Sequence, residues 1–468
     1  LQAPDLPSVG VVLLDEFHER TLECDLALAW LKALRAKRRP ELKLAVMSAT
    51  LDAGVLAAYL PEAERLDVPG RMFPVEVRHL APDARGGPEE GALRALELLA
   101  KEGLDGSVLV FMPGLREIRR TVDVLGPICR AQALALQALH GSMELGAQQD
   151  VRRVIVATNV AETGLTVPGV TMVIDSGLHR VAAYSPSRDL NTLYLSRISV
   201  ANAVQRTGRA GRTAPGRCLR LWTKQDELGM PDALSPEVLR LELSSLALQA
   251  ASLPEPVSWL SPPQDAAWRA AERCLADLRA VGADGHITTR GRALLRYPAP
   301  PRLAAVLAAA HVLGPLEYER ACAMAAVFET AGERRQGRGT DLAALADDLL
   351  LGARQDLPWE AFEVFKQLTR LGGGEAAAAH PPEGGLERVW LESFIGRLGA
   401  RDGLGSSYRL ADGRSVSLGG EKDLPRLLLA LDVRERAGGG QARQIGVGLY
   451  LPVNPATLRQ AFPAECAW

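Results

Sequence analysis

Short apolar runs alternate with helical patterns along the first half of the chain, and this alternation restricts the possible folds more than any other feature. The runs are rich in Val, Ile and Leu and lack a polar residue at every second position, which a half-exposed strand would show. Strands of this kind are buried on both faces, as in parallel sheets covered by helices. The runs are Val9–Leu14, Leu42–Met47, Ser107–Met112, Val154–Ala157 and Met172–Asp175. The sequence therefore predicts an α/β fold with parallel sheets.

Shifts in composition divide the chain into successive units. Two α/β units are expected first, and we place the strand Phe73–Leu80 in the earlier one. Beyond Thr223 the sequence becomes rich in Ala and Leu at helical spacing, and near its end short strands alternate with Gly-rich turns. The predicted units are α/β at 1–82, α/β at 83–224, winged-helix-like at 225–300, a helical bundle at 301–371 and a small β-rich unit at 386–468.

The composition is that of an ordinary globular protein, with 47% hydrophobic and 24% charged residues. A net charge of -2 means that any contact with nucleic acid must come from a local basic groove. The six cysteines form no Cys-x-x-Cys pair, which argues against zinc and disulfides and fits a cytoplasmic protein. No apolar run reaches membrane-spanning length. Because the chain begins at Leu1, within what reads as a domain, we expect it to be truncated there and, at Trp468, truncated again.

Polar residues follow the first two predicted strands. Asp15 and Glu16 end the first strand, where parallel sheets bind ligands. Asp15 can hold Mg²⁺, and Glu16 can orient or deprotonate an attacking water. Ser48 and Thr50 end the second strand. Their hydroxyls either cap the next helix or relay between a phosphate site and a neighbouring domain.

The segment Gln205–Arg212 places Arg206, Arg209 and Arg212 at a spacing of three. On a helix this spacing sets the three side chains one turn apart on one face. Guanidinium groups stay charged and bind phosphate oxygens in pairs, so the pattern predicts a clamp for a polyphosphate. The alternative is a solvated basic face, which is common for an isolated run of charge. The leading Gln205 and the intervening glycines favour the clamp.

Five motifs in a fixed order resemble those of the superfamily 2 helicases of the DEAH/RHA class. They are Asp15–His18, Ser48–Thr50, Phe111–Gly114, Thr158–Thr166 and Gln205–Arg212. The sequence Asp-Glu-Phe-His is typical of the bacterial HrpB branch, and the similarity covers nearly the whole chain. The resemblance implies tandem RecA-like lobes, the first of them incomplete. It also implies ATP-dependent 3′→5′ movement along single-stranded nucleic acid, with RNA as the expected substrate.

The resemblance assigns roles to motif residues in the first lobe. Asp15 would hold the Mg²⁺ of Mg·ATP, and Glu16 would be the catalytic base. His18 would link this lobe to the arginine segment, and Ser48 and Thr50 would couple hydrolysis to movement.

In the second lobe the resemblance implies that Gln205 positions the attacking water. Arg209 and Arg212 would act as arginine fingers, whereas Arg206 would make structural contacts. Residues 180–194 alternate as in a β-hairpin, which is either a strand-separating element or an extension of the sheet. The residues expected to contact the nucleotide or the nucleic-acid backbone are Thr158, Asn159, Thr163, Gly164 and Thr166.

A Walker A phosphate loop is missing, since no lysine in the chain follows a glycine. This gap favours an alternative from another class, a non-hydrolysing nucleic-acid-binding module or pseudo-helicase. The intact residues Glu16, Gln205, Arg209 and Arg212 argue against decay of the catalytic site. A metallohydrolase built on His18 and Glu19 fails because no second histidine completes a His-Glu-x-x-His motif.

Overall fold

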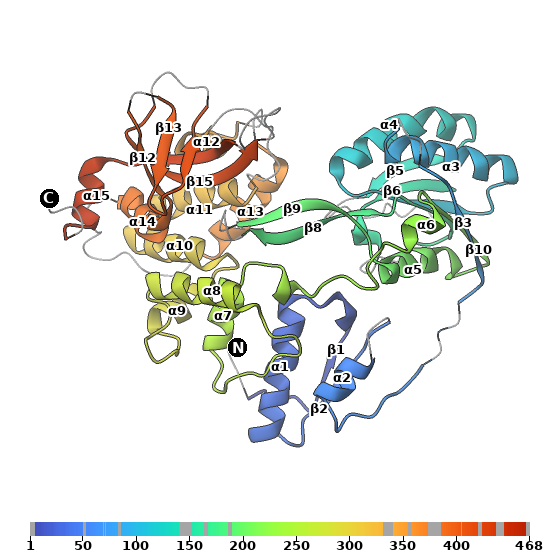
Figure 1. Ribbon diagram of the computed structural model, residues 1–468, viewed down its shortest axis with the longest axis horizontal. Coiled ribbons are helices and arrows are strands. Elements are labelled where there is room, and N and C mark those ends of the chain that lie inside the picture. The colour runs from blue at the N-terminus through green and yellow to red at the C-terminus, as the bar shows by residue number, and fades with distance from the viewer. Residues whose placement is uncertain are drawn as a thin grey trace.

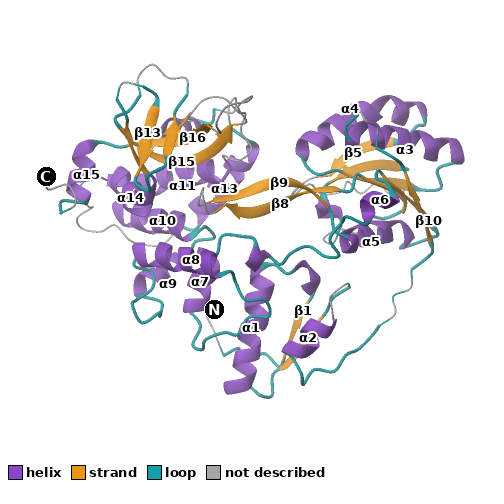
Figure 2. Ribbon diagram, viewed as in Figure 1, coloured by secondary structure: helices purple, strands orange, loops and turns teal. Residues whose placement is uncertain are grey.

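The computed structural model describes residues 5–49, 53–68, 70, 72–82, 86–139, 152–162, 167–185, 190–330, 340–353, 357–372, 385–403, 405–419, 424–436 and 444–464. Figure 1 shows a small first unit, a larger second unit, and a helical and β-rich part, with one long hairpin between the latter two. Figure 2 shows that both of the first two units contain helices as well as strands. Among the described residues, no helix has both the length and the apolar character needed to cross a lipid bilayer.

The first unit contains two parallel strands, β1 (Val11–Leu14) and β2 (Lys43–Val46), joined by helix α1 (Leu22–Lys37). A 3-10 turn, η1 (Phe17–Glu19), precedes α1, and α2 (Ala53–Tyr59) follows β2. One face of this small sheet packs against its helices. Val11 and Leu13 on the other face are 53% and 60% exposed, although parallel strands are usually covered on both sides.

The second unit is built on a six-stranded parallel sheet in the order β3-β10-β7-β4-β6-β5. Alternate residues of β4 (Ser107–Phe111) face opposite sides. Val108 and Val110 join a core with helices α3 and α4, whereas Leu109 and Phe111 pack with Ala210. The other elements of this unit are β3 (Val75–His79), β5 (Ala135–Leu139), β6 (Arg153–Ala157), β7 (Val170–Asp175), β10 (Gly216–Arg220), α3 (Pro88–Glu102), α4 (Leu115–Ala131), α5 (Val200–Gly208), α6 (Lys224–Glu227) and the 3-10 turns η2 (Asn159–Ala161) and η3 (Arg209–Gly211).

Strand β3 lies in a different sheet from the one we expected. We placed Phe73–Leu80 in the first unit, but β3 pairs with β10 at the edge of the second sheet. Two backbone hydrogen bonds extend this pairing, from Phe73 N to Gly211 O (2.9 Å) and from Leu80 N to Arg220 O (2.8 Å). The expected strand is present, but a local pattern of residues carries no information about which sheet a strand joins.

Helix α1 belongs to the first unit in sequence but also packs against the helices beyond the second unit. Leu26 of α1 is buried in one core with residues of α7 (Ser244–Ala251) and α8 (Asp265–Asp277). Just before α1, Arg20 donates to both carboxylate oxygens of Asp25 (2.7 and 3.1 Å) and to Ser261 Oγ (2.8 Å). Because Arg20 and Asp25 are both buried, these contacts fasten the first unit to the helical part.

A long antiparallel hairpin, β8 (Leu178–Ser185) and β9 (Leu190–Arg197), extends from the second unit toward the helical part (Figure 1). It forms its own two-stranded sheet, so of the two alternatives for residues 180–194 the extension of the main sheet is wrong.

The helical and β-rich part shares one core. Leu307 of α10, Trp390 of α14 and Leu429 of β15 all belong to it, so the helical bundle and the last strands are packed together. Strand β12 pairs with β13 and β15, and β16 pairs with β14 and β15, which closes five strands into a small barrel of OB-fold type. The elements are η4 (Glu237–Leu239), α9 (Thr289–Leu294), α10 (Pro301–Leu313), α11 (Pro315–Thr330), β11 (Thr340–Asp341), α12 (Leu342–Leu350), α13 (Trp359–Arg370), α14 (Gly385–Ser393), η6 (Ile395–Arg397), β12 (Leu398–Arg401), β13 (Ser407–Leu410), β14 (Ser415–Ser417), β15 (Leu427–Arg436), β16 (Gln444–Pro452) and α15 (Pro455–Ala461).

A buried histidine lies at the base of the hairpin. His179, in β8, is only 6% exposed. Burial, together with the charges of Arg206 and Arg240, lowers its pKa from the usual 6.5 to about 4, and a hydrogen bond with the backbone of Arg197 opposes this shift. The folded protein therefore holds this imidazole neutral where the unfolded chain would protonate it.

We predict that His179 makes the protein less stable in mild acid. Between pH 6.5 and about 4 only the unfolded chain binds this proton, so the free energy of unfolding falls as the pH falls through that window. At about 1.4 kcal/mol for each pKa unit, the loss between pH 7 and pH 5 is about 2 kcal/mol.

Urea unfolding of His179→Gln at pH 7 and pH 5 checks this contribution, and the variant should lack it. The matched control is His286→Gln, which changes an exposed histidine and should keep the pH dependence of the parent. A His179→Gln variant with an undiminished pH dependence would contradict the assignment.

Candidate functional site

The acidic pair at the end of β1 is held in a fixed and unusual conformation. Glu16 has a left-handed backbone (φ 49°), which a non-glycine residue rarely adopts. Its amide donates to Asp15 Oδ1 (2.8 Å), and the Phe17 amide donates to the carbonyl of Met47 beyond β2 (3.0 Å). Phe17 is fully buried beneath the pair. Both carboxylates thus project from the carboxyl end of the small sheet, and an outlier of this kind is typical of functional sites.

His18 turns inward from the same segment. Its side chain is 8% exposed, and its Nδ1 lies 3.6 Å from a carboxylate oxygen of Glu16. Within the described part of the chain, neither ring nitrogen has a hydrogen-bond partner. A buried polar group without a partner is costly, so this imidazole is available to a water, a ligand or a rearranged neighbour.

A cavity of about 350 Å³ lies between the first two units, beside His18. The second unit contributes Asn159 and Gln205 to its wall, so the structure brings together three residues that we predicted from separate motifs. Other lining residues were not predicted as part of the site: Glu162, His179, Glu237 and Arg240.

The arginine segment differs from our expectation in its local geometry. The α-helix α5 begins at Val200, capped by the Ser199 hydroxyl, and ends at Gly208; a 3-10 turn follows. The three arginines therefore do not share one exposed face. Arg206 is completely buried, Arg209 is 8% exposed, and Arg212 is exposed.

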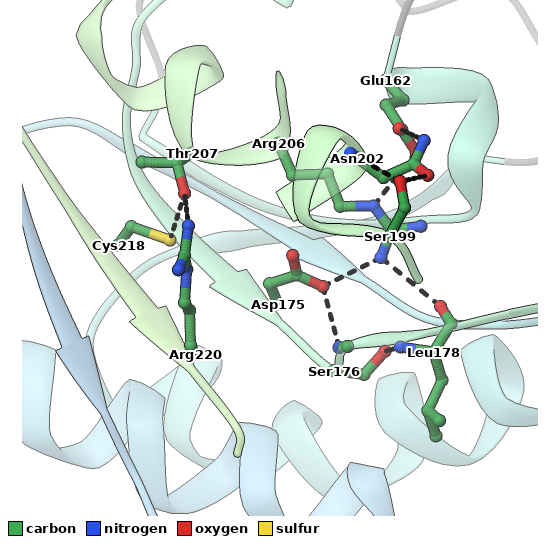
Figure 3. Close-up of polar contacts among 11 residues, drawn as sticks. Glu162, Asp175, Ser176, Leu178, Ser199, Asn202, Arg206, Thr207, Cys218 and Arg220 are labelled. Atoms are coloured by element: carbon green, nitrogen blue, oxygen red, sulfur yellow. Dashed lines mark hydrogen bonds and ion pairs between the residues drawn. The ribbon is translucent and has the colours of Figure 1, made fainter. Parts of the chain in front are cut away.

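Arg206 is drawn inward by two buried carboxylates. Its Nη1 donates to Asp175 Oδ1 (2.8 Å), and its Nε donates to Glu162 Oε2 (3.1 Å), as Figure 3 shows. Its guanidinium also stacks over the Phe111 ring at 4.8 Å. Burial acts to lower the pKa of Arg206, but the two carboxylates outweigh this and raise it, so the side chain stays charged. The structural role expected for Arg206 is thus supported by its contacts.

Arg209, the next arginine of the segment, is largely buried and lies where the charge of Glu16 in the first unit acts on it. Burial lowers its pKa, and the charge of Arg212 lowers it further, whereas Glu162 and Glu16 act in the opposite direction. The influence of Glu16 means that this carboxylate lies within electrostatic range of Arg209, across the boundary between the two units. The arrangement places carboxylates on one side and guanidinium groups on the other, which suits a metal-bound polyphosphate.

The remaining predicted residues are placed only in part. Ser48 is exposed beyond β2, and Thr158 precedes the turn η2, near the cavity. Thr50, Thr163, Gly164 and Thr166 lie outside the described residues. Asp175 was missed as a site residue, although its position at the end of the apolar run Met172–Ile174 marks it as a buried carboxylate in need of a cation.

The second unit matches a known domain model. Residues 91–214 match the model described as the helicase conserved C-terminal domain. This range contains most of the parallel sheet and the whole arginine segment.

Full-length relatives are also similar. The ATP-dependent RNA helicase HrpB of Escherichia coli K12 is 34% identical over 438 residues, which are 90% of this chain and 52% of HrpB. The ATP-dependent RNA helicase HrpA of the same organism is 35% identical over 319 residues, 64% of this chain and 24% of HrpA. The chain therefore spans about half the length of HrpB and about a quarter of HrpA.

Solved structures show the same likeness in the fold. A crystal structure of the E. coli DExH-box NTPase HrpB superposes with a TM-score of 0.76 at 33% identity, over 99% of this chain and 56% of HrpB. A second crystal structure, of the E. coli DEAH/RHA helicase HrpB, superposes with a TM-score of 0.76 at 31% identity. The match covers 97% of this chain and 57% of HrpB. The fold and the ordered motifs agree with these matches: the chain contains the helicase conserved C-terminal domain, and nearly its whole length is similar in sequence and fold to HrpB, a DEAH/RHA helicase.

Proposed function

We propose that this chain carries the nucleotide-hydrolysing and strand-moving parts of an ATP-dependent RNA helicase. The observation that carries the proposal is the cavity that His18 of the first unit shares with Asn159 and Gln205 of the second, beside which the charge of Glu16 acts on Arg209. A site assembled from two units can be completed when they close and broken when they open, so hydrolysis and relative movement are linked.

The residues at this boundary fit Mg·ATP. Mg²⁺ prefers oxygen ligands and needs only one or two protein carboxylates when phosphates supply the rest. Asp15 is exposed at the end of β1 and would hold the ion, which neutralises phosphate charge. Glu16 would accept the proton of the attacking water, with Gln205 orienting that water. Arg209 and Arg212 would stabilise the charge that develops on the transferred phosphoryl group.

Support for a nucleic-acid substrate comes from several places. HrpB and HrpA carry the name RNA helicase. Thr158 and Asn159 are small polar residues suited to contacts with a sugar-phosphate backbone, and contacts of that kind need no base readout. The OB-type barrel is an architecture that binds single strands. We propose single-stranded RNA as the track and 3′→5′ as the direction of movement.

We propose a cytoplasmic location, because the five described cysteines are all free thiols, as in a reducing compartment.

We also propose that Ser48 and His18 couple hydrolysis to movement. The domain boundaries that we propose lie at 224, 300 and 371.

The first test compares RNA-stimulated ATP hydrolysis by this chain with that of a version joined to a phosphate loop upstream of Leu1. We expect turnover only in the version with the loop. In that version Glu16→Gln should retain ATP binding and lose about 10²–10⁴-fold in turnover, because the base that accepts the proton is gone. Folded protein without turnover in either version would favour the non-hydrolysing module, and near-normal turnover in Glu16→Gln would remove Glu16 as the base.

The three arginines should respond differently to substitution. Arg209→Ala and Arg212→Ala should each slow hydrolysis by about 10³-fold or more, with stability and RNA binding preserved. Arg206→Ala should instead cost about 3–5 kcal/mol of stability, because Asp175 and Glu162 would be left as unpaired buried charges. Hydrolysis assays and chemical unfolding of the same three variants measure both effects. Undiminished hydrolysis in both finger variants, or full stability in Arg206→Ala, would show that the roles are misassigned.

RNA binding by this chain should depend strongly on salt. Contacts with a single-stranded backbone release counterions, so the logarithm of the affinity should fall linearly with the logarithm of the salt concentration. A site with about five phosphate contacts would lose roughly a hundredfold between 50 and 200 mM salt. Fluorescence anisotropy with a labelled oligoribonucleotide measures the slope, and a flat response would exclude a groove that follows the backbone.

A further inference from the structure

We propose that Glu237 and Arg240 are positioning residues that tether the β8–β9 hairpin to the start of α1. The tether would make the hairpin follow the acidic segment of the first unit, although the second unit carries the hairpin. Its purpose rests on the proposed function, because it links the segment with Asp15 and Glu16 to an element that is placed to meet nucleic acid.

Glu237 makes the connection to the first unit. Its carboxylate oxygen Oε2 accepts a hydrogen bond from the amide of Leu22, the first residue of α1 (3.2 Å). Its own amide donates to the carbonyl of Arg20 (3.0 Å). Arg20 is in turn fixed by the buried pair with Asp25. Glu237 is therefore bonded to the chain within six residues of Glu16, through both its backbone and its side chain.

Arg240 makes the connection to the hairpin. Its Nη2 donates to the other carboxylate oxygen of Glu237 (2.9 Å), and its Nη1 donates to the carbonyl of Ala182 in β8 (2.6 Å). Its carbonyl accepts from the amide of Tyr184, two residues along the same strand (2.5 Å). The arginine thus holds β8 at two successive positions.

The opposite strand is attached to the same segment. The side-chain oxygen of Asn191, in β9, accepts a hydrogen bond from the amide of Glu242 (2.9 Å). Both strands of the hairpin are therefore bonded to residues 240–242, which directly follow Glu237.

The base of the hairpin is attached elsewhere. Arg180 donates to the carboxylate of Glu117 on α4 (3.3 and 3.4 Å) and passes close to Gly114, so the second unit holds this end. Among the described strands, the hairpin pairs only with itself and not with the main sheet of that unit. Its two ends are held by different units, and a change in the angle between them must bend the hairpin or break the tether.

The tether is also part of the cavity between the units. Glu237 and Arg240 line it together with His18 and Gln205, from the two motifs that we propose to act on the nucleotide. Both tether residues are largely buried, with side chains 23% and 14% exposed, so their ion pair is only partly screened by solvent. Because these side chains line one cavity, a rearrangement of His18 or Gln205 could change the surroundings of Glu237 and Arg240 directly.

The hairpin itself presents residues suited to a nucleic-acid strand. Leu193, Tyr194 and Leu195 are 61%, 46% and 55% exposed. An aromatic side chain such as Tyr194 can stack on an unpaired base, and exposed leucines can insert between neighbouring bases. Movement of the hairpin with the acidic segment would therefore transmit the state of the nucleotide site to bound RNA.

Hydrogen exchange of the 468-residue chain, without nucleotide or RNA, tests the tether. In the described part of the chain, the hydrogen bonds of Glu237 run to Arg20, Leu22 and Arg240, so Glu237→Ala is expected to affect hairpin amides through Arg240 and the segment 240–242. We expect exchange in β8 and β9 to rise about tenfold in Glu237→Ala, and exchange at Leu22 to rise in Arg240→Ala. If the two residues act in series, the double variant should exceed Arg240→Ala by less than twofold in the hairpin.

Control variants make the result decisive. Arg269→Ala removes the same charge from an exposed pair with Asp265 and should leave hairpin exchange unchanged. Arg240→Lys, which can keep one of the two side-chain bonds, should give exchange between that of the parent and that of Arg240→Ala. If Glu237→Ala does not fold, Glu237→Gln takes its place, since it keeps the shape and loses the ion pair.

An effect of the Glu237 variant confined to residues 20–25 and 235–241, with unchanged hairpin exchange, would overturn the proposal. So would an additive double variant. Because no nucleotide is present, this result is independent of ATP hydrolysis: loss of the proposed activity would remove the purpose of the tether and leave the exchange pattern in place.

Discussion

The site between the first two units depends on the burial of one arginine. Arg206 is held by Asp175 and Glu162 beneath the parallel sheet's carboxyl end, and its burial sets where the next residues of the segment emerge. Buried ion pairs add little net stability, because desolvation offsets the attraction, but they strongly disfavour arrangements that leave a charge unpaired. The ion pairs with Asp175 and Glu162 therefore fix the position of the Arg206 side chain. With Arg206 fixed, the 3-10 turn at Arg209–Gly211 brings Arg209 into range of Glu16.

A second constraint concerns how the first unit is held. Its two-stranded sheet is small, and α1 is shared with the core of α7 and α8. The contacts of Arg20 with Asp25 and Ser261 add a buried polar anchor at the same place. The acidic pair therefore rests on an element that is fixed to the helical part, whereas the arginines rest on the second sheet. Relative movement of these two bodies would change the distance between Glu16 and Arg209 directly.

Much of the fold could be predicted from hydrophobic patterning alone. The parallel sheets, the hairpin at 180–194 and the late β-rich unit all follow from periods of apolar residues that local sequence displays. The sheet to which β3 belongs could not be predicted, because its pairing with β10 is a long-range event that its own alternation does not encode. The different burial of Arg206, Arg209 and Arg212 could not be predicted for a similar reason. Their spacing is regular, but Arg206 is buried by Asp175 and Glu162, which lie 31 and 44 residues earlier.

Motif spacing identifies only one of the two histidines that line the cavity. The family resemblance identifies His18 as a linking residue, whereas His179 belongs to no motif and the sequence gives no sign of its burial. In the structure both line one cavity. Burial is the main cause of the low pKa of His179, and the charges of Arg206 and Arg240 lower it further. Arg206 is paired with Asp175 and Glu162, and Arg240 donates a hydrogen bond to the hairpin. A protonated His179 would repel both guanidinium groups, so a neutral imidazole favours the positions in which the structure holds them.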